Sequence, residues 1–565
     1  MHRPLGRIPC LLLALPMTLA LGACSDDDND TNDTDAGVDG GSYELKTQAC
    51  PGDPSCADEG DGTFYAGTAL VDITPDLKEG PSFVDTNGNA AYDRNEDEYT
   101  DENGNGVFDA VWIAGFDSSR PAVEVHDPIQ ARVIALRHNE TTVVIVSADL
   151  IGFFYDHLLG VRERIEASVA DQVDLVIWSS THNHEGPDMI GIWGKTLLES
   201  GLDWDYMAEV QTKVAGAIGD AVDALEPAQV VHSAIAVKDA TGNMEHLFFD
   251  GRDPVIINNE MNVMRFYRPS DDSTIATLVN LGTHPETLWS DNMAITADYP
   301  YYLRKALEDG VPGRFDGLGG MAIYLQSTCG GLIGPGHVDP LDASGIPITD
   351  NHTFEAAEAL GQTYAEFAIK ALNDTDVAVD DTAPDLQFKT REIFLRVDNF
   401  NYQAAYRLGV LSRALFNFDP DAYIDEGNTP DALSQLVYLR IGPTSMVTVP
   451  GEMAPEVFIG CYDGSCTGGW DMIGENNENP PDLSQADSGP YLRDVLQEDG
   501  SLFQWVIGLG QDEVGYILPN YNYQVDPVSP YISDPPGDHY CETNSLGPLA
   551  KDQIVTPLTE MIRGE

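Results

Sequence analysis

The chain has 565 residues, with 93 acidic and 29 basic side chains and a formal net charge of −64 at pH 7. This charge excludes nucleic acid as a partner, because phosphates would be repelled, and it disfavours adsorption to anionic lipid surfaces. The chain is long for one hydrophobic core, but no second linker interrupts it after its N-terminal region, so we expect one large folded unit.

Residues 1–24 are typical of an export signal. A short basic segment precedes an apolar run over 11–21, which is the layout of a secretory signal peptide and is too short to span a membrane. The run ends in Leu-Gly-Ala-Cys, which resembles the lipobox of bacterial lipoproteins, and Ser25 after it favours the outer membrane. We predict an exported lipoprotein held by a lipid on Cys24, at the periplasmic or cell-surface side. The alternative is an ordinary signal peptide.

Residues 25–62 are predicted to form an acidic, flexible tether. They begin SDDDNDTNDTDAGVDGG, without apolar periodicity, and such a segment cannot bury enough surface to offset its ordering entropy. Two pairs of cysteines bracket the short segments PGDPS and YDGS, namely Cys50 with Cys56 and Cys461 with Cys466. In an oxidising compartment both pairs are expected to form local disulfides. Cys329 and Cys541 either pair with each other or stay free.

The segment 82–111 carries a duplicated acidic motif, DTNGNAAYD and then DENGNGVFD. Oxygen ligands at alternate positions, with glycines that allow a sharp bend, suit a hard calcium ion. The EF-hand match is incomplete, because neither loop ends in a clean Gly-x5-Glu. We predict a structural calcium-binding insertion, the alternative being a flexible acidic loop. Its expected ligands are Asp85, Asn87, Asn89, Asp93, Asp101, Asn103, Asn105 and Asp109.

Strands and helices are predicted to alternate along the rest of the chain. Strand-like apolar runs cover residues 143–147, 173–177, 230–237, 275–281, 321–325, 393–397, 446–449 and 505–509. Helix-like stretches cover residues 158–170, 207–225, 301–307 and 354–372. In 207–225 apolar residues recur at three- and four-residue spacing, as an amphipathic helix requires. The alternation predicts an α/β fold with mixed β-sheets covered by helices.

Four of the strand-like runs stop at potential metal ligands. They lead to the segment His182-Asn183-His184, to His284, to Glu452 and to Tyr516. Sites in α/β sheets gather at strand ends, and two imidazoles with a carboxylate are a known catalytic zinc set that leaves a position for water. Zinc makes that water a usable nucleophile near neutral pH. Spacing alone leaves open whether both His182 and His184 bind metal or one serves as an acid or base, since both point to one side of an extended segment.

These segments resemble, in the same order, the motifs of the neutral/alkaline non-lysosomal ceramidases. THNHEGPD is similar to that family's THTHSGPG, LVNLGTHPETL to its second histidine segment, TVPGEM to its PGE motif and EVGYILP to its tyrosine segment. GTALVDITP and VHDPIQARVIAL resemble its N-terminal strands. The order holds from about residue 66 to 550, which is nearly the whole body of the chain.

The resemblance implies a single large catalytic domain, residues 63–565, with a central zinc pocket. Carried over position by position, it makes the zinc ligands His182, His284, Glu452 and Tyr516. His184 is then free to contact substrate or pass protons. Tyrosine is an uncommon zinc ligand, so the alternative for Tyr516 is a hydrogen-bonded core phenol.

One departure from the family concerns its catalytic serine, which stands in a segment that ends Ser-Pro-Asn. In the matching stretch 326–335 no serine stands directly before the proline, where Ile333 or Gly334 takes that position, and Ser327 and Cys329 lie near but do not match. The chain is therefore identified as a divergent relative that is expected to use a zinc-activated water. Arg252 is expected to contact the oxyanion, its alternative being a loop salt bridge, and Asp149 is expected to orient a histidine.

The function predicted from these segments is zinc-dependent hydrolysis of a linear amide bond, with ceramide-like N-acyl lipids as the substrate. One alternative is a zinc hydrolase of a different amide or ester on the same scaffold. The other is a non-catalytic surface lipoprotein that binds a ligand in the pocket. Zinc content separates the last alternative from the first two.

Overall fold

The computed structural model describes residues 43–565, apart from 54–55, 57–59, 78–82, 102–103, 105, 107, 240, 332 and 425–426. The signal segment and most of the expected tether lie outside the described residues. Within the tether's expected bounds, however, β1 (Thr47–Cys50) pairs with β18 (Leu386–Arg396), so the folded body begins earlier than predicted. No helix in the described part of the chain combines the length and the apolar composition that a membrane span requires.

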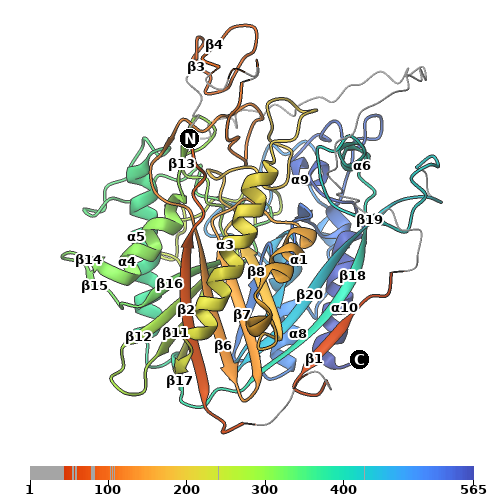
Figure 1. Ribbon diagram of the computed structural model, residues 1–565. Coiled ribbons are helices and arrows are strands. Elements are labelled where there is room, and N and C mark those ends of the chain that lie inside the picture. The colour runs from red at the N-terminus through yellow and green to blue at the C-terminus, as the bar shows by residue number, and fades with distance from the viewer. Residues whose placement is uncertain are drawn as a thin grey trace.

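Three sheets of five or six strands account for most of the described strands (Figure 1). The first sheet contains, in order, β8 (Leu175–Ser180), β7 (Thr141–Ala148), β6 (Gln130–His138), β2 (Phe64–Asp72) and β9 (Glu226–Pro227). The second contains β16 (Met321–Gln326), β12 (Thr274–Leu281), β11 (Glu260–Tyr267), β10 (Gln229–Ala236) and β17 (Val379–Asp381). The third contains β1, β18, β20 (Asp431–Ile441), β21 (Thr444–Thr448) and β23 (Phe503–Ile507), with β19 (Leu415–Phe416) beside β20.

Each of these sheets combines antiparallel neighbours with one parallel pair. The parallel pairs are β7 with β8, β12 with β16, and β21 with β23. The sheets meet along these pairs, because β16 contacts both β8 and β23, and β12 contacts β23. Parallel neighbours end at the same edge of a sheet, so the three sheets bring several strand ends to one place.

The three sheets share a buried apolar core, and helices cover their other faces. Ile177, Leu278 and Trp505 come from the first, second and third sheet and belong to one cluster. All eight residues of β7 are buried, which is the pattern of a strand covered on both faces. The prediction of an α/β fold with mixed sheets covered by helices is confirmed.

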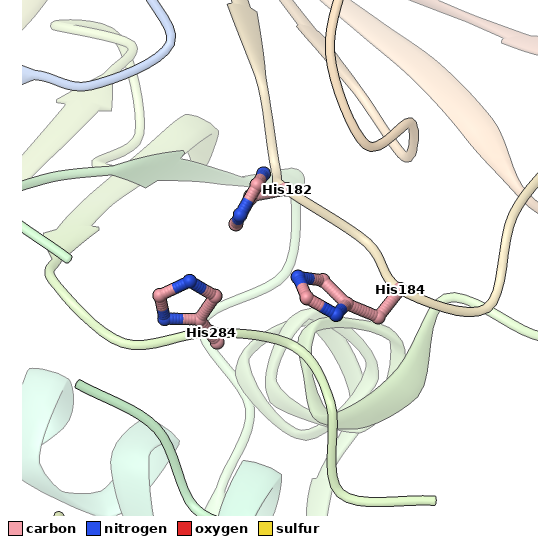
Figure 2. A group of neighbouring side chains, drawn as sticks. All are labelled: His182, His184 and His284. Carbon is pink, nitrogen blue, oxygen red and sulfur yellow. The ribbon is translucent and has the colours of Figure 1, made fainter. Parts of the chain in front are cut away.

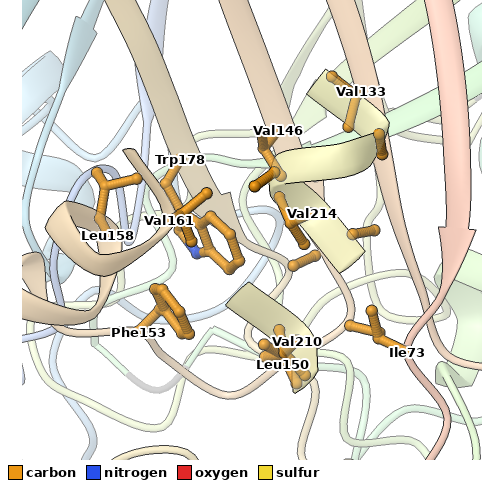
Figure 3. Close-up of a cluster of buried hydrophobic side chains, with 14 of the residues drawn as sticks. Ile73, Val133, Val146, Leu150, Phe153, Leu158, Val161, Trp178, Val210 and Val214 are labelled. Atoms are coloured by element: carbon orange, nitrogen blue, oxygen red, sulfur yellow. The ribbon is translucent and has the colours of Figure 1, made fainter. Parts of the chain in front are cut away.

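The covering helices are α1 (Tyr155–Arg164) and α3 (Trp204–Asp223) on the first sheet, α4 (Asp298–Asp309) and α5 (Phe354–Asn373) on the second, and α8 (Leu492–Glu498) and α10 (Ala550–Arg563) on the third. Figure 3 shows Val214 of α3 beside Val146 of the first sheet and Val210 of α3 beside Leu150, which follows that sheet's β7. Burial of such an apolar face contributes about 1.5–3 kcal/mol for each large aliphatic side chain.

Helix boundaries follow from local signals. The Asp203 side chain accepts hydrogen bonds from the backbone amides at the start of α3, and Thr353 does the same for α5, which satisfies otherwise unpaired amides. The helices predicted over 207–225 and 354–372 are therefore confirmed. The single helix predicted over 158–170 is wrong, because the backbone becomes extended at Ile165 and separates α1 from α2 (Ala167–Ala170).

Both predicted disulfides are present, Cys50–Cys56 and Cys461–Cys466. Cys329 and Cys541 are free and buried. The two cysteines that the sequence left unassigned therefore do not pair with each other.

In the acidic segment β3 (Phe83–Val84) pairs antiparallel with β4 (Glu98–Tyr99), at the top of Figure 1. In its first loop the Asp85 carboxylate accepts from the backbone amides of Gly88 and Ala90. Asn103 and Asn105 of the second loop lie outside the described residues. Calcium binding by this segment stays a prediction.

Candidate metal centre

Side chains at the ends of the three parallel pairs converge on one buried place. His182 follows β8, and its φ of 66° lies in the left-handed region, which few non-glycine residues adopt and which is often found at functional sites. His284 follows β12. Beyond β21 and β23 the chain forms a second short parallel pair, β22 (Glu452–Met453) and β24 (Tyr516–Ile517), in which Glu452 stands opposite Tyr516.

The distances define a compact cage. Glu452 Oε2 lies 2.9 Å from His284 Nε2 and 3.4 Å from His182 Nε2. The ring centroids of His182 and His284 are 4.7 Å apart. Figure 2 shows that the rings of His182 and His184, which come from one segment, and the ring of His284, which comes from another, face a common space.

In both His182 and His284 the second ring nitrogen, Nδ1, donates a hydrogen bond to a backbone carbonyl. His182 Nδ1 donates to Ile151 O at 2.7 Å, and His284 Nδ1 donates to Ile333 O at 2.5 Å. A hydrogen bond of this kind fixes the tautomer and leaves the Nε2 lone pair for a metal ion. Both rings therefore present Nε2 to the cage, on the side of Glu452.

The donor set fits a divalent metal ion. His182, His184 and His284 form one group whose donor atoms lie within 4.8 Å of one another, and His284, Cys329 and Glu452 form a second. Burial alone would raise the pKa of Glu452, yet His182 and His284 hold it well below its usual range. Nitrogen, carboxylate and sulfur donors of this kind are the ligands that zinc takes in proteins.

His184 differs from the other two histidines because its ring is not tied down. Neither ring nitrogen has a hydrogen-bond partner, although the side chain is buried. Burial, together with the neighbouring His182 and His284, lowers its pKa well below the usual value, so the ring is neutral at pH 7. The Phe116 ring packs edge-on against it, with centroids 5.0 Å apart.

The overall structure decides what this fold resembles. No protein-family model matches the chain, and no curated protein matches it in sequence. Among solved structures it is similar to neutral ceramidase from Pseudomonas aeruginosa, with 15% identity, a TM-score of 0.57, and coverage of 89% of this chain and 74% of that one. A ceramidase complexed with C2 is similar at 14% identity and a TM-score of 0.58, over 89% of this chain and 75% of that one. The fold is that of the neutral ceramidases.

Within this ceramidase-like fold, Asp149 does not orient a histidine. Both of its carboxylate oxygens accept from Arg304, at 2.7 and 2.8 Å, and one also accepts from the Gln130 amide. The orienting groups of His182 and His284 are the two carbonyls named above. Asp149 follows β7 directly and pairs with Arg304 of α4, which neutralises it. The sequence carried no sign of that pairing.

Arg252 forms a buried ion pair with Glu542. Its guanidinium lies 3.0 Å from the Glu542 carboxylate and donates to Asn522 O at 3.1 Å, and both members of the pair are buried. This geometry matches the salt-bridge alternative. The expected contact between Arg252 and an oxyanion stays a prediction.

The site also contains residues that the sequence motifs missed. Glu286 lies two residues after His284, its carboxylate is 3.9 Å from His184 Nδ1, and burial raises its pKa to about 8. Phe116 and Trp289 pack together beside His184, with ring centroids 5.0 Å apart. Glu286 could have been proposed from the sequence, because it stands two positions after the predicted ligand His284. No sequence pattern marked Phe116 or Trp289 as site residues.

Proposed function

We propose that the chain is a zinc-dependent hydrolase of a linear amide bond, with ceramide-like N-acyl lipids as its substrate class. The observation that carries the proposal is the meeting of His182 Nε2, His284 Nε2 and the Glu452 carboxylate in one cage. The cage lies at the strand ends of a fold whose solved examples include a neutral ceramidase.

His182, His284 and Glu452 would hold the ion, and Tyr516 would be the fourth ligand. The register of β22 with β24 supports Tyr516, because it sets this residue directly opposite Glu452. When bound, zinc supplies a Lewis acid that polarises the scissile carbonyl and lowers the pKa of water. The nucleophile in this proposal is water, because no serine stands directly before Pro335.

His184 moves the proton in this scheme. Its neutral, unpartnered ring accepts a proton as water attacks the amide carbon and returns it to the leaving nitrogen, so that the amine departs uncharged. Arg120 holds the backbone beside it, donating to the His184 carbonyl oxygen and, at 3.3 Å, to Glu185. The base is thus free to protonate at its ring while its main chain stays fixed.

A metal analysis combined with a substrate panel tests the proposal. The purified protein is expected to contain one zinc per chain and to hydrolyse N-acyl sphingosine faster than short acyl amides or acyl esters. His184→Gln should keep the zinc and lose most of kcat. His138→Gln, which changes an imidazole at the end of β6 that pairs with the start of β7, should keep both. Preference for an ester would favour the alternative function, a zinc hydrolase of a different amide or ester on the same scaffold. Absence of both zinc and hydrolysis would favour a ligand-binding lipoprotein.

We also propose that a lipid on Cys24 anchors the enzyme at the outer membrane, on the periplasmic or cell-surface side. The support is the lipobox-like sequence that ends at Cys24. Cys24→Ser should release the protein from the membrane fraction. An unchanged membrane pool would refute the anchor and leave the proposed chemistry untouched.

A further inference from the structure

A fifth strand end reaches the metal centre and brings a sulfur atom with it. β16 is the parallel partner of β12, and the two strands pair up to Leu281 opposite Gln326. The chain beyond β12 continues to His284, and the chain beyond β16 continues to Cys329. Because the two strands end at the same edge, Cys329 enters the cage from the side that carries His284.

The donor atoms of Cys329, His284 and Glu452 lie within 4.8 Å of one another. Zinc binds sulfur at about 2.3 Å and nitrogen or oxygen at about 2.0–2.2 Å. Two donors on one ion are therefore about 3–4 Å apart, which small side-chain rotations can reach from this starting point. Cys541, the other buried free cysteine, belongs to no such group among the described residues.

Backbone hydrogen bonds fasten Cys329 to both of its neighbours in the cage. The Gly330 amide donates to Met453 O at 3.0 Å, which ties the turn to the strand of Glu452. The Ile333 amide donates to Cys329 O at 3.1 Å, and Ile333 O in turn accepts from the His284 amide at 2.9 Å. The segment that orients His284 is thus the same segment that positions Cys329.

We propose that Cys329 binds, through its sulfur, the divalent ion that His284 and Glu452 bind. The inference rests on the metal centre of the proposed function and makes the Cys329 sulfur the alternative to the Tyr516 phenol in that centre, so that the position for water stays open. As the sulfur–metal bond forms, the thiol proton leaves to solvent, since the thiolate is the ligand form. A sulfur donor makes the centre more selective for thiophilic ions such as zinc, cobalt and cadmium over magnesium or calcium.

Spectroscopy of the metal-loaded protein tests the inference without an activity assay. The metal-free chain is first titrated with Co²⁺, and the stoichiometry is measured. Wild type is expected to bind one cobalt and to show a sulfur-to-cobalt charge-transfer band in the near ultraviolet. Cys329→Ser should lose that band and keep the visible cobalt bands of its nitrogen ligands, and the matched variant Cys541→Ser should keep both.

X-ray absorption of the zinc-loaded wild-type chain gives an answer that needs no variant, with a sulfur neighbour expected at about 2.3 Å. A zinc shell of nitrogen and oxygen alone would overturn the inference while leaving the proposed function standing. A charge-transfer band that survives Cys329→Ser, or disappears in Cys541→Ser, would overturn it too. Failure of wild type to bind any cobalt or zinc would overturn the proposed function and this inference together.

Discussion

His284 Nε2 lies 2.9 Å from Glu452 Oε2, although 168 residues separate the two in the chain. The contact joins the loop beyond the second sheet to the short β22–β24 pair that follows the third sheet, and His182, in the loop beyond the first sheet, lies 3.4 Å from the same oxygen. The cage is complete only when all three sheets have assembled, because each sheet contributes the end of its parallel pair. A substitution that shifts one strand end should therefore weaken metal binding.

Gly330→Ala is expected to weaken zinc binding. A Cβ on residue 330 would lie 2.5 Å from Ala454 N and 2.6 Å from Glu452 O, both backbone atoms, so β22 must move. Loss of a group that positions a ligand typically costs about 10–100-fold in metal affinity, and chelator competition measures it. Gly216→Ala is the control, because a Cβ there meets no atom within 4 Å. Unchanged affinity in Gly330→Ala would contradict the role given to this turn.

Asp149→Asn is expected to destabilise the protein and to leave its zinc in place. The change leaves Arg304 buried without its charged partner, which costs about 3–5 kcal/mol of unfolding free energy. Asp272→Asn removes an exposed partner of Arg265 and should cost about 1 kcal/mol or less. Urea denaturation measures both variants. Loss of zinc at unchanged stability would instead place Asp149 at the metal.

His157→Phe should make the protein less sensitive to acid. His157 is packed near Phe153 and Trp204, and burial lowers its pKa to about 3. Below a pH of about 6.5 the unfolded chain takes up a proton that the folded chain refuses, so stability falls by up to about 1.4 kcal/mol per pH unit from this residue. That loss extends down to the folded pKa. Thermal unfolding from pH 7.5 to 5 should show a shallower decline in the variant, and identical slopes would contradict the assignment.

Ser327→Ala should keep at least about a tenth of the wild-type kcat/KM, since removal of a true nucleophile typically costs a factor of about 10⁴ or more. The side chain is buried beside β16 but stands outside the position of the family serine. Hydrolysis of an N-acyl amide measures the effect. Complete loss of activity with zinc still bound would identify Ser327 as the nucleophile.

The strands and the convergence of their ends could be predicted from local sequence. Short apolar runs that stop at His182, His284 and Glu452 carry both the strand period and the ligand in one segment. Both disulfides could be predicted in the same way, because only a few residues separate the two cysteines of each pair. These features depend on neighbours in the chain, and the sequence displays those neighbours directly.

Other features depend on tertiary pairing and could not be predicted. Asp149 and Arg252 looked like site residues because each lies near a strand end or an acidic turn, but their partners Arg304 and Glu542 come from distant helices. In the sequence Cys329 was compared only with the position of the family serine, which it does not match, so it was given no role in the site. Its place beside Glu452 follows from the register of β16 with β12, which no single segment reveals.

The central claim is that three sheets assemble one cage for a divalent ion around Glu452. Crystals of the zinc-loaded protein, measured at the zinc absorption edge, test it most directly. The account predicts one strong anomalous peak within bonding distance of His182 Nε2, His284 Nε2 and the Glu452 carboxylate. A stoichiometrically loaded crystal with no peak there, or with its main peak elsewhere, would contradict it.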